Sequence, residues 1–207
     1  MALVIVSSAS GQHASVVYEA ALLSGMMVQG YASLALHGPV ALLHCPYLGS
    51  LDDLIDGQSA SSFVIACGDN SVRESVSRRL EEAGSQAATV CHPAAILSPS
   101  AIVGSGAMFL AGAILGPRAA IGDGTIVNHA ASVDHDCVVG PFANLCPGAR
   151  LGGAVHVGEG AFIGINASVL PGLRLGAGCV IGAGAVVTQD VPEGATVVGV
   201  PARQIGR

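Results

Sequence analysis

Apolar residues recur at every sixth position through the second half of the chain. The series starts at Leu97 and runs without a break to Val187. Glycine often follows the apolar residue, and alanine mostly stands two places before it. A period of six matches neither the 3.6-residue repeat of a helix nor the alternation of a simple hairpin sheet. Hexapeptide repeats are typical of a parallel β-helix. We therefore expect triangular coils of three short strands, with the every-sixth residue inside and glycine where the turn needs a positive φ.

Residues 1–91 show a different pattern, in which apolar runs alternate with helix-like segments. The expected elements are a strand over 2–6, a helix over 14–24, strands over 27–31 and 63–67, a helix over 71–83 that Asn70 can cap, and a strand over 87–91. This alternation predicts a small parallel α/β unit, whose ligand would lie beyond the carboxyl ends of the strands. The loop after the first strand is either a diphosphate cradle at a helix N-terminus or a tight turn without a ligand. Pro93 marks the junction, which gives expected domains of residues 1–91 and 92–207.

The composition narrows the class of protein. The 207 residues include 29 glycines and no tryptophan, only 11% are charged, and the formal net charge is −6. The high apolar content excludes intrinsic disorder, and the lack of clustered basic residues argues against a nucleic-acid partner. Neither a basic signal region nor a run of 18 apolar residues is present, so no membrane insertion is expected. The six cysteines lack metal-ligand spacing and are expected to be free thiols. These features predict a cytoplasmic protein.

Charged residues are also too few to cover the sides of the predicted coils. We therefore expect other copies of the chain to cover these sides. Closed symmetry is the default for homo-oligomers, and a homotrimer is the expected assembly.

The densest polar cluster within the repeat is Asp134, His135 and Asp136. A carboxylate that binds one imidazole nitrogen fixes the tautomer and raises the basicity of the other nitrogen. His135 is therefore the candidate general base, provided that the turn of a coil brings Asp136 to it. His129 lies six residues earlier, at the same position of the neighbouring face, and is not expected to touch His135 within one chain.

Five motifs together resemble those of the left-handed β-helix hexapeptide acyltransferases. They are residues 9–13 (ASGQH), 65–70 (IACGDN), 92–95 (HPAA), 133–137 (VDHDC) and 199–203 (GVPAR). The combination is similar to the branch of bacterial sugar O- and N-acyltransferases that includes sialic acid O-acetyltransferases and N-acetyltransferases of nucleotide-linked 4-amino sugars. The resemblance covers essentially the whole chain. It implies a Rossmann-like α/β unit followed by a left-handed parallel β-helix, with acetyl-CoA as co-substrate and no metal.

The resemblance also implies roles for residues of the coils. His135 would be the general base, and Asp136 would increase its basicity. Acetyl-CoA would lie in a groove between neighbouring subunits. The residues implied to contact it are Asn144, Gly153 and Ile165, while Arg203 either meets a coenzyme phosphate or is an exposed charge. Gly153 comes eighteen residues after His135, one full coil, so its N–H is expected to face the thioester oxygen while His135 takes the proton of the attacking sugar.

The resemblance further implies that the N-terminal unit binds the sugar nucleotide. The matching residues are Ser10, Gly11, Gln12, His13, Gly68 and Ser71. Members of this branch usually carry an acidic pair after the second strand, whereas this chain has the sequence GYAS over residues 30–33. This departure leaves the identity of the nucleotide base open.

The leading interpretation is an acetyl-CoA-dependent N-acetyltransferase that acts on a nucleotide-activated 4-amino sugar in surface glycan biosynthesis. A close alternative is an O-acetyltransferase acting on a sialic-acid-like sugar, with the same base and a hydroxyl nucleophile. A different class is a trimeric zinc hydratase of the carbonic-anhydrase type, for which His129, His135 and His156 are the only candidate ligands in the coils. A non-catalytic scaffold is the remaining alternative.

Overall fold

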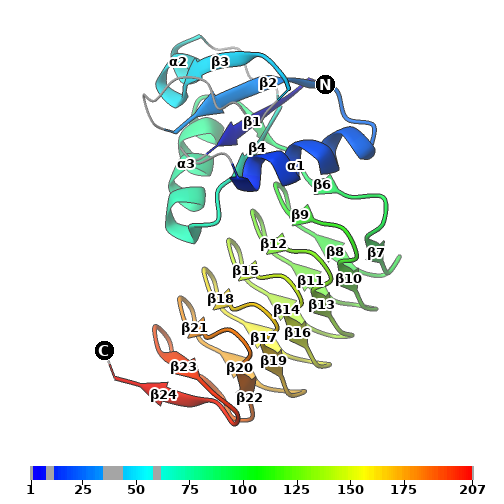
Figure 1. Ribbon diagram of the computed structural model, residues 1–207, viewed down its shortest axis with the longest axis vertical. Coiled ribbons are helices and arrows are strands. Elements are labelled where there is room, and N and C mark those ends of the chain that lie inside the picture. Colours follow the sequence, from blue (N-terminus) through cyan, green and yellow to red (C-terminus); the bar gives the residue numbers. More distant parts are fainter. Residues whose placement is uncertain (1, 8–11, 35–43, 58–61, 207) are drawn as a thin grey trace. The chain divides into compact units, whose positions relative to one another are not determined.

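The structure is a computed structural model that describes residues 2–7, 12–34, 44–57 and 62–206. The chain divides into two compact units, Met1–Pro93 and Ala94–Arg207. The first combines helices with a sheet, and the second is a stack of coils made of short strands (Figure 1). Ser10 and Gly11 lie outside the described residues.

The first unit is built on a parallel sheet with the strand order β3-β2-β1-β4-β5. Its strands are β1 (Leu3–Ser7), β2 (Val28–Ser33), β3 (Tyr47–Ser50), β4 (Ser62–Ala66) and β5 (Gln86–Ala87), and its helices are α1 (Gln12–Leu23), α2 (Leu51–Asp56) and α3 (Asn70–Glu82). Every residue of β1 and β4 is buried, as in central parallel strands that are covered on both faces. The strand order reverses between β1 and β4, so the carboxyl ends of these two strands flank the crevice in which such sheets bind ligands.

The first unit departs from the expected elements in three ways. Strand β3 and helix α2 were not expected, since each is short. The capping box between Ser50 and Asp53 is a sequence signal for the start of α2. Helix α3 is capped by Asp69, which accepts a hydrogen bond from the N–H of Val72, so the expected cap at Asn70 is wrong. The expected strand over 87–91 is divided: β5 closes the first sheet, and β6 (Val90–Cys91) pairs with strands of the coils.

The short strands from β6 onward form three sheets, which are the faces of a prism and are parallel apart from the final strand β24. Face 1 consists of β7 (Ile96–Leu97), β10 (Ile114–Leu115), β13 (Ser132–Val133), β16 (Arg150–Leu151), β19 (Ser168–Val169) and β22 (Val186–Val187). Face 2 consists of β8 (Ile102–Val103), β11 (Ala120–Ile121), β14 (Val138–Val139), β17 (His156–Val157) and β20 (Arg174–Leu175). Face 3 consists of β6, β9 (Met108–Phe109), β12 (Ile126–Val127), β15 (Asn144–Leu145), β18 (Phe162–Ile163), β21 (Val180–Ile181), β23 (Thr196–Val198) and β24 (Arg203–Ile205).

The every-sixth residues form the interior of the prism, as the period predicts. From Phe109 to Val187 all of them are buried, whereas Leu97 in the first coil is half-buried. Each pairs in register with the residue one coil away, as Leu115 does with Val133. This exact stacking repeats every eighteen residues, so a residue's neighbours along the coil axis follow directly from the numbering.

The expected reason for the glycine after each interior residue is wrong. The coil glycines with positive φ lie elsewhere in the turn, as Gly112 and Gly172 do. The glycine that follows the interior residue is required because the next coil passes close to it. A Cβ at Gly116 would lie 2.7 Å from the backbone nitrogen of His135, and one at Gly122 would lie 2.5 Å from that of Pro141.

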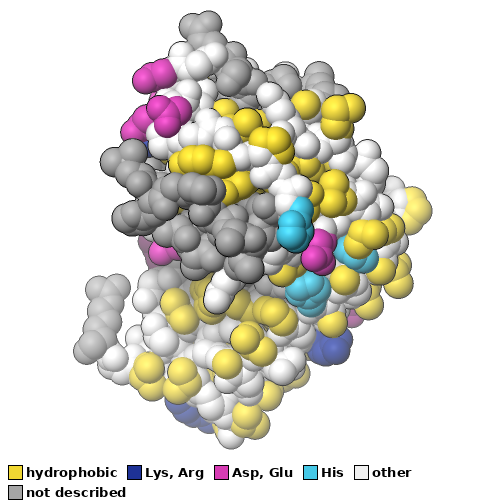
Figure 2. All heavy atoms as spheres, turned by 45° about the horizontal axis from the view of Figure 1, so that its top comes forward, with side chains coloured by type: hydrophobic (Ala, Val, Ile, Leu, Met, Phe, Trp, Pro, Cys, Tyr) yellow, Lys and Arg dark blue, Asp and Glu magenta, His cyan; other side chains and the backbone are white. Residues whose placement is uncertain are grey.

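The coils end in a shortened repeat. Val191, four residues after Val187 rather than six, forms a bridge with Leu175. Strands β23 and β24 then close the stack as an antiparallel pair. Charged side chains are sparse over the face drawn in Figure 2. Within the described ranges, no helix is both long and apolar enough to cross a membrane.

Candidate active site

The corner between face 1 and face 2 carries a column of residues that occupy the same turn position in successive coils. The His135 column consists of Pro99, Pro117, His135, Gly153 and Pro171. Proline has no N–H, so the coil does not need a backbone donor at this position. The N–H of Gly153 accordingly makes no hydrogen bond within the described residues. The column thus presents one imidazole and one available backbone donor on adjacent coils.

The imidazole of His135 lies against Gly153. A Cβ built on Gly153 would lie 2.6 Å from Nε2 and 2.5 Å from Cε1 of the ring. The backbone is held by the coil register, since the N–H of Ala154 donates to the carbonyl of His135 at 2.8 Å. Only glycine leaves room for the ring at this point, and the expected stacking of His135 on Gly153 is present in the structure.

A carboxylate fixes the His135 ring from its other side. His135 Nδ1 and Asp136 Oδ2 are 2.7 Å apart. An ionised carboxylate only accepts hydrogen bonds, so Nδ1 carries the proton and Nε2 keeps its lone pair. The two side chains are adjacent in sequence, and they meet because Asp136 takes a left-handed backbone conformation with φ of 60°. The turn therefore leaves Nε2 as the basic atom, on the side of Gly153.

Arg118 binds the same carboxylate, a contact that the sequence interpretation missed. Its Nε donates to Asp136 Oδ1 at 2.6 Å, and a terminal guanidinium nitrogen donates to Oδ2 at 2.8 Å. Arg118 lies one coil before Asp136, at the same turn position and with φ of 58°. The eighteen-residue spacing between opposite charges is the signal that could have identified the pair.

The Arg118 guanidinium, and then the His135 ring, hold the pKa of Asp136 well below its usual range through hydrogen bonds to the carboxylate. The same carboxylate raises the pKa of Arg118. The side chains are 53% exposed at His135, 40% at Asp136 and 64% at Arg118, so solvent and reactants can reach them. The carboxylate stays ionised at any pH at which a histidine acts as a base.

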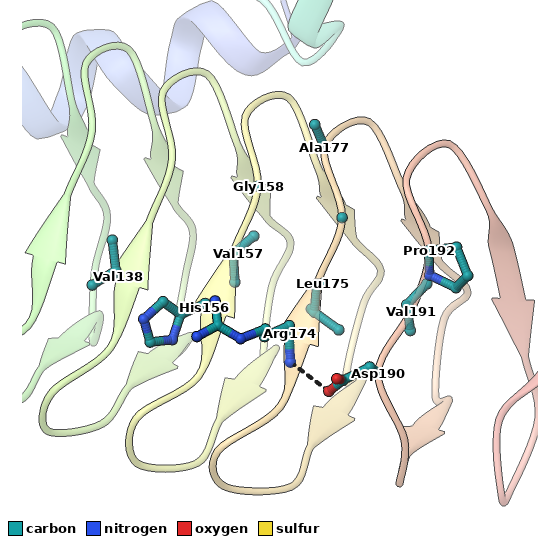
Figure 3. A pocket seen from close by; sticks show the side chains of 11 residues that line it. Val138, His156, Val157, Gly158, Arg174, Leu175, Ala177, Asp190, Val191 and Pro192 are labelled. Atoms are coloured by element: carbon teal, nitrogen blue, oxygen red, sulfur yellow. Dashed lines mark hydrogen bonds between the residues drawn. The ribbon is translucent and has the colours of Figure 1, made fainter.

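A cavity of about 470 Å³ lies on face 2 beside this corner (Figure 3). Its lining includes Val138, His156 and Arg174, each of which comes three positions after a residue of the His135 column. In Figure 3 the His156 ring and the Arg174 guanidinium lie next to each other. The N–H of Arg174 donates to Asp190 Oδ1 at 2.8 Å. This wall of face 2 is apolar at Val138 and carries His156 and Arg174 farther along the coil axis, and none of the residues that line the cavity belongs to the His135 column.

Solved structures place this arrangement among known proteins. A histidine-to-asparagine variant of perosamine N-acetyltransferase from Caulobacter crescentus, in complex with CoA and GDP-perosamine, is 36% identical with a TM-score of 0.93 over 100% of this chain and 98% of that chain. The acetyltransferase domain of PglB from Neisseria gonorrhoeae, in complex with acetyl coenzyme A, is 32% identical with a TM-score of 0.91 over 99% of this chain and 100% of that chain. WeeI from Acinetobacter baumannii is 26% identical, with a TM-score of 0.85 over 98% and 100% of the two chains.

Residues 154–189 also match the bacterial transferase hexapeptide family with six repeats. The chain belongs to the hexapeptide-repeat sugar acyltransferases. Its fold is the expected Rossmann-like unit followed by a left-handed parallel β-helix.

This sugar acyltransferase does not bring all the predicted coenzyme contacts together within one chain. Asn144 is buried in β15 of face 3, and Ile165 is exposed at the corner between face 3 and face 1, away from the His135 column. The N–H of Ile165 makes no hydrogen bond within the described residues. Arg203 is exposed at the start of β24, where its guanidinium donates to the carbonyl of Ala202 at 2.8 Å. Only Gly153 adjoins His135.

The predicted substrate residues of the first unit follow two strands. Gln12 is exposed and His13 half-buried at the start of α1, after β1. Gly68 follows β4, with open space where a Cβ would be. Ser71 donates to Asp69 Oδ1 at 2.7 Å in the first turn of α3. Because β1 and β4 are neighbours at the reversal of strand order, both segments lie at the same crevice of the sheet.

A buried arginine supports the second of these segments and was also missed. Arg73 is 1% exposed and donates to the carbonyl of Cys67 and the side chain of Asn70, both at 3.0 Å. Burial lowers its pKa to about 10, so it remains charged. Its hydrogen bonds hold the turn from β4 into α3.

The histidines that a zinc hydratase needs do not converge within one chain. His129 lies at the corner between face 3 and face 1, and His156 lies in β17 on face 2. No group of three metal-ligating side chains occurs among the residues that the structure describes.

Proposed function

We propose that this sugar acyltransferase is an acetyl-CoA-dependent N-acetyltransferase that acts on the amino group of a nucleotide-activated 4-amino sugar. The observation that carries the proposal is that a basic atom and a free donor lie side by side: Nε2 of His135 keeps its lone pair, and the N–H of Gly153, one coil away, is available. The relative from Caulobacter crescentus, with CoA and GDP-perosamine bound, supports a nucleotide sugar as the acceptor. The relative from Neisseria gonorrhoeae supports acetyl-CoA as the donor.

His135 acts as the general base in the proposed reaction. The amino nitrogen of the sugar attacks the thioester carbonyl, and Nε2 takes the proton that the nitrogen loses. Asp136 accepts the Nδ1–H, so it keeps the ring in the reactive tautomer and stabilises the imidazolium as it forms. General base catalysis of this kind supplies about 10²–10⁴-fold in rate. The coenzyme leaves as its thiol after receiving a proton, and no covalent enzyme intermediate is required.

Gly153 stabilises the charge that develops on the thioester oxygen. Its N–H is not used by the coil and lies beside the His135 ring. A preorganised donor at a developing oxyanion contributes about 10²–10³-fold in rate. The same glycine thus leaves space for the base and supplies the electrostatic stabilisation.

The donor would lie along the cavity on face 2, with Arg174 as the cation available to its phosphates. In the proposed homotrimer, Asn144 and Ile165 of a neighbouring copy form the opposite wall of the groove. Arg203, at the end of the stack, would meet a coenzyme phosphate. This division of contacts between copies explains why they do not meet within a single chain.

The acceptor would bind the first unit through the loops after β1 and β4. Ser10, Gly11, Gln12 and His13 are the proposed diphosphate contacts of one loop, with Gly68 and Ser71 in the other. Residues 30–33 contain no carboxylate and lie within β2, so we propose no acidic contact from this segment to the base or ribose. An enzyme that acetylates a nucleotide-linked amino sugar of this kind would act in surface glycan biosynthesis.

Release of coenzyme A tests the proposal. Purified protein with acetyl-CoA is offered nucleotide-linked 4-amino sugars and, in parallel, sialic acids. Rapid thiol release with an amino-sugar nucleotide, abolished by His135→Ala, is the expected result. Release with sialic acids alone would assign O-acetylation instead, and activity that survives intact in His135→Ala would exclude His135 as the base.

A further inference from the structure

The pair formed by Arg118 and Asp136 is built into the same corner as the base, yet neither the coil nor the proposed proton transfer requires it. We propose that Arg118 is a positioning residue for the base: it orients the Asp136 carboxylate toward His135 and limits the stabilisation that this carboxylate gives to the protonated ring. The inference rests on the proposed function, because it concerns how the same base is tuned.

The geometry shows one carboxylate shared between two donors. Oδ2 of Asp136 is 2.8 Å from a terminal nitrogen of Arg118 and 2.7 Å from Nδ1 of His135, while Oδ1 is 2.6 Å from Arg118 Nε. Two parallel contacts to a guanidinium fix the plane of a carboxylate, which a single contact does not. His135 and Asp136 are sequence neighbours on an exposed turn, so the guanidinium supplies the constraint that their own backbone lacks.

Arg118 is itself held by the coil. Its N–H donates to Ser100 Oγ at 3.1 Å, and the N–H of Asp136 donates to the carbonyl of Pro117 at 3.0 Å. The register between β10 and β13 places Arg118 directly one coil from Asp136. The stacking of two coils therefore fixes the backbones of Arg118 and Asp136 one coil apart, so that their exposed side chains can meet.

The charges around the His135 ring give Arg118 a second effect. The groups that face this residue are Asp136, at Nδ1, and Asp134, whose Oδ1 accepts the backbone N–H of His135 at 2.7 Å; the backbone of Gly153 covers the third side. Both side chains are acidic, and Arg118 is the cation bound to one of them. Without Arg118, two uncompensated carboxylates would favour the protonated ring, which cannot accept a proton.

The test compares Arg118→Gln and Arg118→Lys with Arg79→Gln, which removes another exposed arginine–carboxylate pair, to Asp52 at 2.6 Å. Arg118→Gln is expected to lower kcat about tenfold, a part of the contribution of a positioned base. The acidic limb of the pH profile should move to higher pH by on the order of 0.5 unit, since exposed charges are screened. Arg118→Lys should return the acidic limb of the pH profile to its wild-type position but restore only part of kcat. Arg79→Gln should have the kcat and pH profile of the wild type.

A double variant tests whether Arg118 acts through Asp136. In an Asp136→Asn background, Arg118→Gln should cause no further loss of kcat. Additive losses would overturn the proposal, as would a kcat and pH profile of Arg118→Gln that equal those of the wild type.

NMR of the His135 ring keeps the test independent of the substrate. The resonances are assigned by their loss in His135→Gln, and the ring is titrated in the wild type and in Arg118→Gln. A higher titration midpoint and a mixed tautomer in Arg118→Gln support the proposal, and identical titrations and tautomers refute it. If the wild type releases no coenzyme A with any amino-sugar nucleotide, the proposed function fails while this spectroscopic result still decides the role of Arg118.

Discussion

His129 and His135 occupy the same turn position on neighbouring corners of one prism, and they differ only in their neighbours. The N–H of each donates to the side chain of the preceding residue, Asn128 or Asp134. The carbonyl of each accepts an N–H from the next coil at 2.9 or 2.8 Å. Two histidines with the same backbone environment thus allow the effect of the surrounding side chains to be seen directly.

The two histidines differ in the residues that occupy the equivalent turn positions around them. Where His135 has Asp136, Arg118 and Gly153, His129 has Ala130, Gly112 and Pro147. His129 therefore lacks the carboxylate that would fix its tautomer, the cation that would hold that carboxylate, and the free N–H one coil later. The repeat provides the backbone frame many times, and three substitutions around one histidine convert that frame into a candidate active site.

The largest effect is expected from removing the base. His135→Ala should lower kcat/KM by about 10²–10⁴-fold, the usual contribution of general base catalysis. His129→Ala is the matched variant at the other corner and should lower it at least tenfold less. Steady-state rates of coenzyme A release measure both. Equal losses in the two variants would remove the distinction between the corners.

A nearly comparable loss is expected at Gly153. Gly153→Pro follows the proline of the neighbouring coils, but the variant lacks the N–H and, like Gly153→Ala, places a Cβ against the His135 ring. The loss in kcat should be about 10²–10³-fold, the effect of deleting one oxyanion donor.

Gly153→Ala separates the two roles of the glycine. It keeps the N–H but places a Cβ against the His135 ring. Its kcat should fall between those of the wild type and Gly153→Pro. If Gly153→Pro were as active as the wild type, the proposed oxyanion donor would be wrong.

A smaller loss, about tenfold in kcat, is expected for Asp136→Asn, because the ring keeps its place over Gly153 but loses its orienting carboxylate. A kcat of Asp136→Asn equal to that of the wild type would contradict the role of the carboxylate.

The pKa of Asp136 is depressed, so any stability that its charge gives is complete above the ordinary aspartate pKa and is lost only as pH falls through the depressed value. The wild-type Tm should therefore not change between pH 5 and 8 on account of Asp136. A Tm that changes between pH 5 and 8 in the wild type but not in Asp136→Asn would contradict this expectation.

The last prediction concerns folding and is made at Gly116. A Cβ there would lie 2.7 Å from the backbone nitrogen of His135. Gly116→Ala should lower the free energy of unfolding by about 1–3 kcal/mol, as overpacking does, measured by urea denaturation. Gly206→Ala, where a Cβ meets open space, is the control. An equal free energy of unfolding for the two variants would show that the coils can move apart without loss of stability.

The coils could be predicted from the sequence because one interaction repeats in them. Each interior residue packs on the residue eighteen positions away, so the six-residue period determines both the strands and the stacking of His135 on Gly153. The apolar period did not reveal Arg118, because its partner Asp136 lies a full coil away in the sequence. Applying the coil spacing to polar residues, as to apolar ones, would have found it.

The α/β unit was harder to predict because its contacts are less regular. Strand β3 is short and half-buried at the edge of the sheet, so it lacks a strong apolar pattern. Arg73 is buried by the turn around it, and nothing in its helix signals that burial. Residues 30–33, which the sequence pattern puts after the second strand, lie inside β2, because this strand continues to Ser33.

A crystal structure of this chain with coenzyme A and a nucleotide-linked 4-amino sugar tests the central claim most directly, because it shows which histidine meets the acceptor. The amino nitrogen should lie within about 2.6–3.2 Å of His135 Nε2, with the N–H of Gly153 facing the position of the thioester oxygen. An amino nitrogen bound instead by His129, or held beyond reach of His135, would contradict the assignment of this corner as the active site.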